Sequence, residues 1–280
     1  MKAKLVLGIL ITGILVIGLT VAMDRGRAQI RDISQSGDVT PTVDLNGNKP
    51  LSSKEKEIRN QRGRKYRSSA PIEKMEDQDT VLKLPDPHSP VEPAFPVEQS
   101  DLVILGTVND SQAFISNDRS DVYAEFRVRV DKIFKINNVL KIKSAENIVA
   151  ERSGGKVRFD SGKLQRRGEL GRGLPQKSRQ YILFLNWDAP GNDCIIITGY
   201  EVQGQIIHPL DGLPESNPNI YKNYKRYRNA VLNNFLCELE EAITKSTRGI
   251  ALDQLLRAKD LRPKAIKQLT GFAIAWEYIK

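Results

Sequence analysis

The stretch Val122-Tyr-Ala-Glu-Phe-Arg-Val-Arg-Val-Asp131 decides the fold class, because apolar and polar side chains alternate along it without a break. A period of two places one kind of side chain on each face of a β-strand. This stretch is therefore predicted to be a strand with one buried and one hydrated face, the arrangement common in antiparallel sheets.

Further strands are predicted on both sides of this stretch. Leu102–Val108 is a nearly continuous apolar run, which is typical of a buried strand. Because no helical periodicity intervenes, residues 98–213 are predicted to form an antiparallel β-domain. We expect either a small closed barrel of the five-stranded oligonucleotide/oligosaccharide-binding (OB) type or a sandwich. The other predicted strands, each flanked by Gly, Asn, Asp or Pro, are 147–151, 156–159, 181–186, 194–200 and 205–208.

Residues 214–280 are predicted to be a helical extension that packs on this domain. Pro218 suits the first turn of a helix, and apolar side chains then recur every four residues at Tyr227, Val231, Phe235 and Leu239. This pattern predicts a helix to about residue 245. A second helix is predicted near 250–258, and Pro263 ends it.

The N-terminal residues determine where the protein is expected to reside. Residues 5–23 carry no charge, and as a helix they would extend roughly 28 Å, close to the thickness of the bilayer hydrocarbon. Residues 1–23 are therefore predicted to be a transmembrane anchor or a cleaved signal peptide. We expect a single-pass inner-membrane protein with its main domain outside the cytoplasm, or an exported protein if the signal is cleaved.

Residues 24–97 contain few large apolar side chains and are predicted to be a disordered tether. Prolines between Pro85 and Pro96 predict an extended spacer at its end. A basic cluster within the tether is either a solvated charge run or a contact for anionic lipid headgroups or an anionic envelope polymer. This cluster surrounds Tyr66 and consists of Arg59, Arg62, Arg64, Lys65 and Arg67.

The formal net charge of +9 suggests an anionic partner, although residues 98–213 are nearly neutral. The strongest charge feature of the domain is the glycine-rich segment 154–179, predicted to be a flexible loop or long hairpin at the barrel mouth. Its charges are either solvated or in contact with an anionic polymer or lipid. Nucleic acid is less favoured, because only Phe159 offers a ring for stacking. The candidate contact residues are Lys156, Arg158, Lys163, Arg166, Arg167, Arg172, Lys177 and Arg179.

The two cysteines, Cys194 and Cys237, are too few for a disulfide framework or a thiolate metal site. In an oxidising compartment, a disulfide between them would join the barrel to the C-terminal helix. Otherwise they are two buried thiols that act as small apolar side chains.

Few residues suggest chemistry. His208 and Asp211 form at most half of a hydrolytic pair, and His88 lies in the predicted spacer, so no histidine-based metal site is expected. Asp188 and Asp193 flank a turn that either holds a calcium ion or is explained by turn residues alone. We therefore predict no catalytic residue, no metal and no cofactor.

Several stretches form a recognisable set within residues 98–213. They are Ser100–Val108, Tyr123–Val130, Glu151-Arg-Ser-Gly-Gly155 with Val157 and Phe159, Tyr181-Ile-Leu-Phe-Leu185, and Thr198-Gly-Tyr200 with Pro209-Leu-Asp-Gly212. As a set, they resemble an uncharacterised family of exported or membrane-anchored bacterial proteins with a small β-barrel domain. The resemblance implies export and a barrel, but no known activity. The chain departs from the family at Gln176-Lys-Ser-Arg179, where members commonly have a glycine.

These observations predict a membrane-anchored envelope protein that acts as a non-catalytic binding or scaffolding module. Its expected partners are the membrane, through the N-terminal helix, and an anionic polymer or lipid. The alternative is an OB-like barrel that faces the cytoplasm and binds single-stranded nucleic acid. A third hypothesis is an enzyme whose catalytic groups the sequence does not reveal.

Overall fold

The structure is a computed structural model that describes residues 40–47, 52–85, 88, 91–212 and 222–247. Among these residues no helix is long and apolar enough to cross a membrane. The predicted anchor at 1–23 and the predicted second helix at 250–258 lie outside the described ranges. The described part is mainly β, as expected, with eleven strands in two sheets.

The larger sheet contains seven strands and includes the strand that decided the fold class. That strand, β4 (Val122–Ile136), is longer than the alternating stretch and pairs with β3 (Leu102–Ile115) over most of its length. The strands predicted at 181–186, 194–200 and 205–208 are confirmed as well. The remaining strands of this sheet are β5 (Asn147–Ser153), β8 (Gln180–Asp188), β9 (Asp193–Gln203), β10 (Ile206–Pro209) and β11 (Ala230–Val231).

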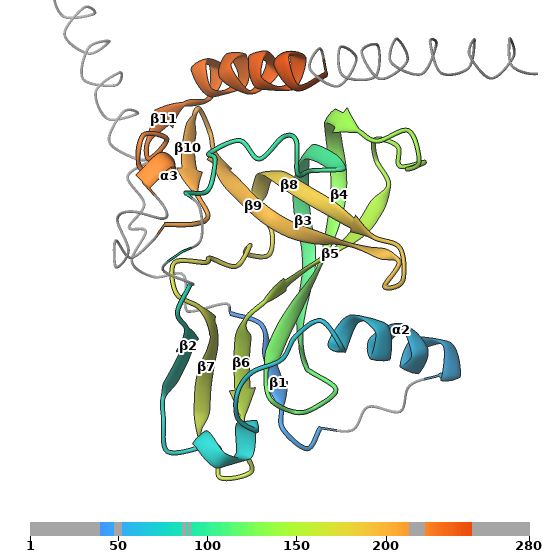
Figure 1. Cartoon of the computed structure of the whole chain (residues 1–280), viewed down its shortest axis with the longest axis vertical. Helices are drawn as coiled ribbons and strands as arrows, with labels where there is room; N and C mark the ends of the chain where they lie inside the picture. The colour runs from blue at the N-terminus through green and yellow to red at the C-terminus, as the bar shows by residue number, and fades with distance from the viewer. Residues whose placement is uncertain (1–39, 48–51, 86–87, 89–90, 213–221, 248–280) are drawn as a thin grey trace, which may run out of the picture. The chain divides into compact units, whose positions relative to one another are not determined.

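Five strands of this sheet are paired in a ring (Figure 1). β3 pairs antiparallel with β4 on one side and with β8 on the other. β4 pairs antiparallel with β5, β5 pairs parallel with β9 through Ala150 and Glu151, and β9 pairs antiparallel with β8. Each of the five strands therefore has two neighbours in the ring, and their apolar faces share one core.

That core explains the alternation in β4. Ala124, Phe126, Val128 and Val130 are fully buried in it, together with side chains from β3, β5, β8 and β9. The opposite face is hydrated only over its second half, because Tyr123 and Glu125 are also buried. The expectation of one wet face is thus wrong for the first half of β4, which another segment of the chain covers.

A second core joins the outer face of β8 and β9 to the C-terminal residues. It contains an aromatic group made of Phe95, Phe184, Tyr200, Tyr227 and Phe235. The helix over 232–247 contributes Phe235 and Leu239 to this core, so the prediction that a helix packs on the β-domain is confirmed.

The predicted continuous helix to residue 245 is wrong before residue 232. In its place are the short helix α3 (Lys222–Lys225), a turn and β11. Asn229 adopts a positive φ of 64°, and its backbone N–H donates to the Ile207 carbonyl of β10. The backbone of this segment therefore bonds to the sheet, although its side chains recur with helical spacing.

The smaller sheet has the order β1-β6-β7-β2 (Figure 1). β6 (Gly155–Arg158) and β7 (Leu164–Glu169) form an antiparallel hairpin. β1 (Thr42–Asp44) pairs parallel with β6, and β2 (Thr80–Lys83) pairs parallel with β7. The hairpin thus has an N-terminal strand on each edge, and β7 occupies part of the segment expected to be a flexible loop.

The prediction of a disordered tether is therefore wrong for residues 40–47 and 52–85. Besides β1 and β2, this region forms α2 (Ser53–Gly63) and the 3₁₀ helix η2 (Ile72–Met75). α2 starts with a capping box in which Ser52 and Glu55 each satisfy the other's backbone N–H. Leu45 and Ile72 are buried apolar side chains of this described region, and they pack with Val157 and Phe159 in a small core.

We expect Ile72→Ala to lower the free energy of unfolding by about 2–4 kcal/mol, because it leaves a cavity at a fully buried site. Leu84→Ala is the matched control, since Leu84 is 78% exposed in the same region and its loss should change stability by no more than about 0.5 kcal/mol. Chemical denaturation of both variants provides the comparison. Equal effects would contradict a folded N-terminal region.

Candidate binding site

Four carboxylates converge on the outer side of the ring of strands, and we call them the carboxylate cluster: Glu125, Glu151, Asp188 and Asp193. Glu125 and Glu151 face each other across the β4–β5 pairing. Asp188 and Asp193 face each other where β8 and β9 meet their connecting turn. Like charges at such spacing repel, so this arrangement requires cations nearby.

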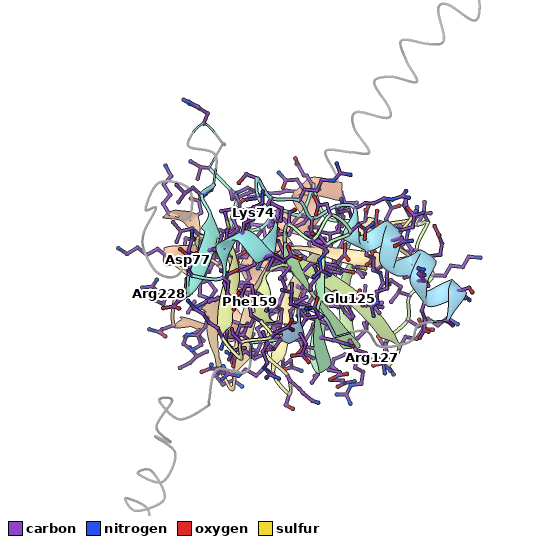
Figure 2. The ribbon with its side chains drawn as sticks, turned by 90° about the horizontal axis from the view of Figure 1, so that it is seen from below. Lys74, Asp77, Glu125, Arg127, Phe159 and Arg228 are labelled. Carbon is purple, nitrogen blue, oxygen red and sulfur yellow. The ribbon has the colours of Figure 1, made fainter. Side chains whose placement is uncertain are left out.

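The cations come from the region expected to be a tether. Three side chains from α2 and the residues just after it point into the cluster, and we call them the basic triad: Arg59, Arg62 and Lys65. Figure 2 shows Glu125 on the side of the domain where α2 lies. These three residues of the basic cluster noted in the sequence thus contact this chain's own carboxylates.

Arg62 is the most buried member of the triad, at 6% exposure. Its Nη1 lies 2.8 Å from Glu125 Oε2, and its Nε lies 2.6 Å from Asp193 Oδ2. Nε also donates to the Gly191 carbonyl at 3.1 Å. Arg62 therefore connects β4 to the β8–β9 turn, and Arg59 adds a second ion pair to Glu125.

Lys65 lies among the other three carboxylates. Its Nζ is 2.7 Å from Asp188 Oδ2 and 3.5 Å from Asp193 Oδ1, and it also pairs with Glu151. Oxygens of these three carboxylates lie within 4.8 Å of one another, which is close enough to hold a metal ion. The Lys65 ammonium supplies the positive charge at that position.

Asp188 and Asp193, the two residues of the calcium hypothesis, contact the Lys65 ammonium. Asp188 Oδ2 accepts a hydrogen bond from the Gly191 N–H at 2.9 Å, so turn chemistry accounts for part of its role. The structure adds Glu151, which the sequence did not single out, and it adds Lys65 as the cation. The sequence around Glu151 does not indicate that Lys65 is its partner, because the two residues are distant along the chain.

Aromatic contacts accompany the ion pairs. The Tyr66 ring stacks on the Tyr123 ring with centroids 4.8 Å apart and an interplanar angle of 11°. The Arg59 guanidinium carbon lies 3.3 Å from the Phe114 ring centroid, a cation–π contact. The covered face of β3 and β4 therefore presents both negative charge and aromatic rings.

Burial shifts the protonation of the carboxylate cluster. Burial, reinforced by the neighbouring Asp193 charge, raises the pKa of Glu151 to about 8, although Lys65 acts in the opposite direction. Burial also raises the pKa of Glu125, against the effect of Arg59 and Arg62. Burial alone would lower the pKa of Lys65, but its bonds to Asp188 and Glu151 raise it above its ordinary value.

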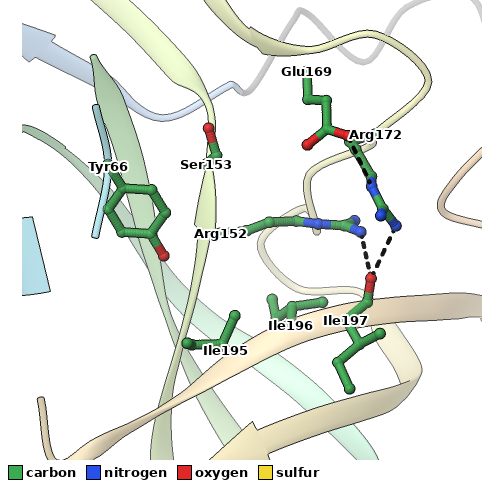
Figure 3. A pocket seen from close by; sticks show the side chains of 8 residues that line it. All are labelled: Tyr66, Arg152, Ser153, Glu169, Arg172, Ile195, Ile196 and Ile197. Atoms are coloured by element: carbon green, nitrogen blue, oxygen red, sulfur yellow. Dashed lines mark hydrogen bonds and ion pairs between the residues drawn. The ribbon is translucent and has the colours of Figure 1, made fainter. Parts of the chain in front are cut away.

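A pocket of about 210 Å³ is lined in part by Tyr66, the residue whose ring stacks on Tyr123 (Figure 3). One wall is apolar and comes from β9. The other walls carry two arginines, a glutamate and the Ser153 hydroxyl, which has no hydrogen-bond partner among the described residues. The lining residues are Tyr66, Arg152, Ser153, Glu169, Arg172, Ile195, Ile196 and Ile197.

Both pocket arginines are bound to Asp211, which is fully buried. Arg152 makes two bonds to its carboxylate, at 2.8 and 2.6 Å, and Arg172 lies 3.3 Å from Oδ2. The Thr198 hydroxyl donates a further hydrogen bond at 2.8 Å. Burial alone would raise the pKa of Asp211, but the charges of Arg152 and Arg172 hold it below its ordinary value. Asp211 is thus held by two arginines and a threonine hydroxyl.

The predicted anionic-ligand residues are dispersed rather than gathered at one loop. Six of the eight form ion pairs within the chain: Arg158 with Asp44, Lys163 with Asp79, Arg167 with Asp121, Arg172 with Asp211, Lys177 with Asp110 and Arg179 with Glu201. Lys156 lies on β6 and is half-buried, and Arg166 is exposed on β7. Most of the eight residues thus pair with carboxylates of other segments of the chain.

The two cysteines lie in different layers, and both are free thiols. Cys194 is buried in the core inside the ring of strands, where burial raises the pKa of its thiol to about 12. Cys237 is exposed on the helix over 232–247, which packs on the other core. The predicted disulfide between barrel and helix is therefore absent from the structure, and only one of the two thiols is buried.

Comparison with known proteins adds no identification. Neither a scan against protein-family models nor a search of curated proteins gives a match to this chain.

We expect the wild type to lose stability relative to the Glu151→Gln variant as the pH rises from about 5 to about 8.5. The Glu151 carboxyl has a pKa of about 8 in the folded protein and an ordinary value of 4.5. The folded state therefore holds a proton that the unfolded state releases, and this stabilisation, full below 4.5, is lost as the pH rises through 8. The free energies of unfolding of the two proteins, measured with denaturant, should diverge by at least about 1 kcal/mol across this range. Parallel pH profiles would refute the raised pKa of Glu151.

Asp211→Asn should lower the free energy of unfolding by about 3–5 kcal/mol, because it leaves two arginines without their counter-charge in a buried site. Asp110→Asn is the control, since its pair with Lys177 joins two largely exposed side chains and should contribute at most about 1 kcal/mol. Thermal and chemical unfolding give both values. A loss of less than about 1 kcal/mol for Asp211→Asn would contradict the proposed role of the ion pairs.

Proposed function

We propose that this chain is an envelope protein, held at the inner membrane by residues 1–23, whose β-domain acts as a non-catalytic binding or scaffolding module. The uncharged run at 5–23 supports the anchor, because its length matches the hydrocarbon thickness. The β-domain supports the binding role, because it combines a stable ring of strands with a charged face and a small pocket.

The ring of strands belongs to a closed barrel of the OB type in this proposal. The order β3-β4-β5-β9-β8 and back to β3 supports a barrel over a sandwich, since the pairings β5–β9 and β3–β8 join what would otherwise be two separate sheets. In chain order β3 is the first of the five strands, and it pairs with the second, β4, and with the fourth, β8. This order is the observation on which the proposal depends most.

The pocket favours binding over catalysis. The guanidinium groups of Arg152 and Arg172 both contact the Ile197 carbonyl, as Figure 3 shows. Both also pair with Asp211, so neither is poised to stabilise a reacting group. The carboxylate cluster disfavours nucleic acid as the ligand of the barrel, because it places negative charge on the face of β4 and β5. The cytoplasmic nucleic-acid-binding alternative is accordingly the weaker one.

Protease protection on intact cells that express the full chain with a C-terminal tag tests the proposed location. We expect the protein in the inner-membrane fraction, with the tag digested once the outer barrier is opened and the inner membrane is intact. A cytoplasmic protein of known location is the control for membrane integrity. A tag that stays protected until the inner membrane is lysed would overturn the proposal.

A further inference from the structure

We propose that residues 53–66 are a displaceable cover over an acidic binding face, and that the partner of this face is a basic, aromatic-bearing segment of another polypeptide. The inference rests on the proposed binding function of the β-domain and names its partner class. The face consists of the carboxylate cluster together with the rings of Phe114 and Tyr123.

The cover is attached mainly by charge rather than by apolar burial. Ile58 is the only large apolar side chain of α2, and it is half-buried, whereas the buried residues of this helix are Arg62 and Gly63. The contacts of the cover include the ion pairs of the basic triad, the stacking of Tyr66, the cation–π contact of Arg59, the bond of Arg62 to Gly191 and two bonds to Asn117. These contacts can be exchanged for equivalent contacts from another cationic segment, whereas their loss without replacement would leave buried charges unpaired.

The ends of the cover are anchored independently of it. Leu45 precedes the cover and Ile72 follows it, and both are buried in the small core beside the β6–β7 hairpin. β1 and β2 are hydrogen-bonded to opposite edges of that hairpin. α2 also carries its own capping box, so it is helical by local interactions. The segment between the anchors can therefore leave the face while the two sheets remain folded.

The face that the cover occupies is the one by which OB-type barrels bind their ligands. In chain order the five strands are β3, β4, β5, β8 and β9. The face spans the second and third of them, β4 and β5, and the loops that follow β3 and β8. Asn117, in the loop between β3 and β4, donates to the Asn60 carbonyl at 2.8 Å. Gly191, in the loop between β8 and β9, accepts from Arg62. The cover thus takes the place of a ligand.

The chemistry of the face defines what replaces the cover. Once the cover and its cations leave, the face presents the carboxylate cluster alone, so an anionic ligand such as a phosphate or a lipid headgroup is repelled. In the cover, cations recur three residues apart at Arg59, Arg62 and Lys65, and an aromatic ring follows at Tyr66. A lysine- and arginine-rich segment with the same spacing and a following aromatic residue would make the same contacts.

Binding of a labelled peptide with the sequence of residues 52–67 to the full-length protein tests this inference by fluorescence anisotropy. Arg62→Ala/Lys65→Ala removes the competing contacts of the cover, and we expect this variant to bind the peptide at least about tenfold more tightly than the wild type. Binding should weaken steeply with added NaCl. The matched control is Lys56→Ala/Arg64→Ala, which removes the same charge from exposed positions of the segment and should behave as the wild type.

The wild type provides a second readout if the double variant does not fold. Excess peptide should speed hydrogen exchange in α2 and leave the amides of β4 and β5 protected. A folded double variant that binds the peptide no better than the wild type would overturn the inference, as would unchanged exchange in α2. Self-association of the variant by exchange of α2 would also overturn it, since the partner would be a second copy. The topology assay is independent of these outcomes, so the two proposals can fail separately.

Discussion

The structure depends on one electrostatic constraint: four carboxylates are buried or half-buried on one outer face of the β-domain, and such groups cannot remain there without cations. Asp193 is almost fully buried and pairs with Arg62, and Lys65 lies among Asp188, Asp193 and the buried Glu151. The N-terminal region must therefore fold against the domain. Its composition alone would leave it disordered, because it has too few apolar side chains to offset the entropy of ordering.

This constraint is met by a division of roles within the N-terminal region. Leu45 and Ile72 provide apolar burial, and β1 and β2 provide backbone pairing at the two edges of the β6–β7 hairpin. α2 provides charge. Buried ion pairs add little net stability compared with apolar contacts, but removing one partner is costly, so they select one arrangement over others. The same principle operates at Asp211, where two arginines join segments that are distant along the chain.

The β-domain was largely predictable from the sequence, and the site was not. Alternation at 122–131 and the apolar run at 102–108 predicted β4 and β3, because both patterns are local. β1, β2 and β7 lack such a pattern, since they are short strands that depend on neighbours for burial. Asp188 and Asp193 were singled out, as were the basic residues around Tyr66, but nothing local indicates that these two groups bind each other. Long-range pairing of charges leaves no periodicity in a sequence.

The central claim is that the basic triad and the carboxylate cluster hold the N-terminal region on the domain. A double-mutant cycle between Arg62→Ala and Asp193→Ala, read from free energies of unfolding, tests it most directly. The account predicts that the two substitutions are coupled by about 1–3 kcal/mol, because each alone leaves a buried charge unpaired. Additive effects, with a coupling below about 0.5 kcal/mol, would contradict it.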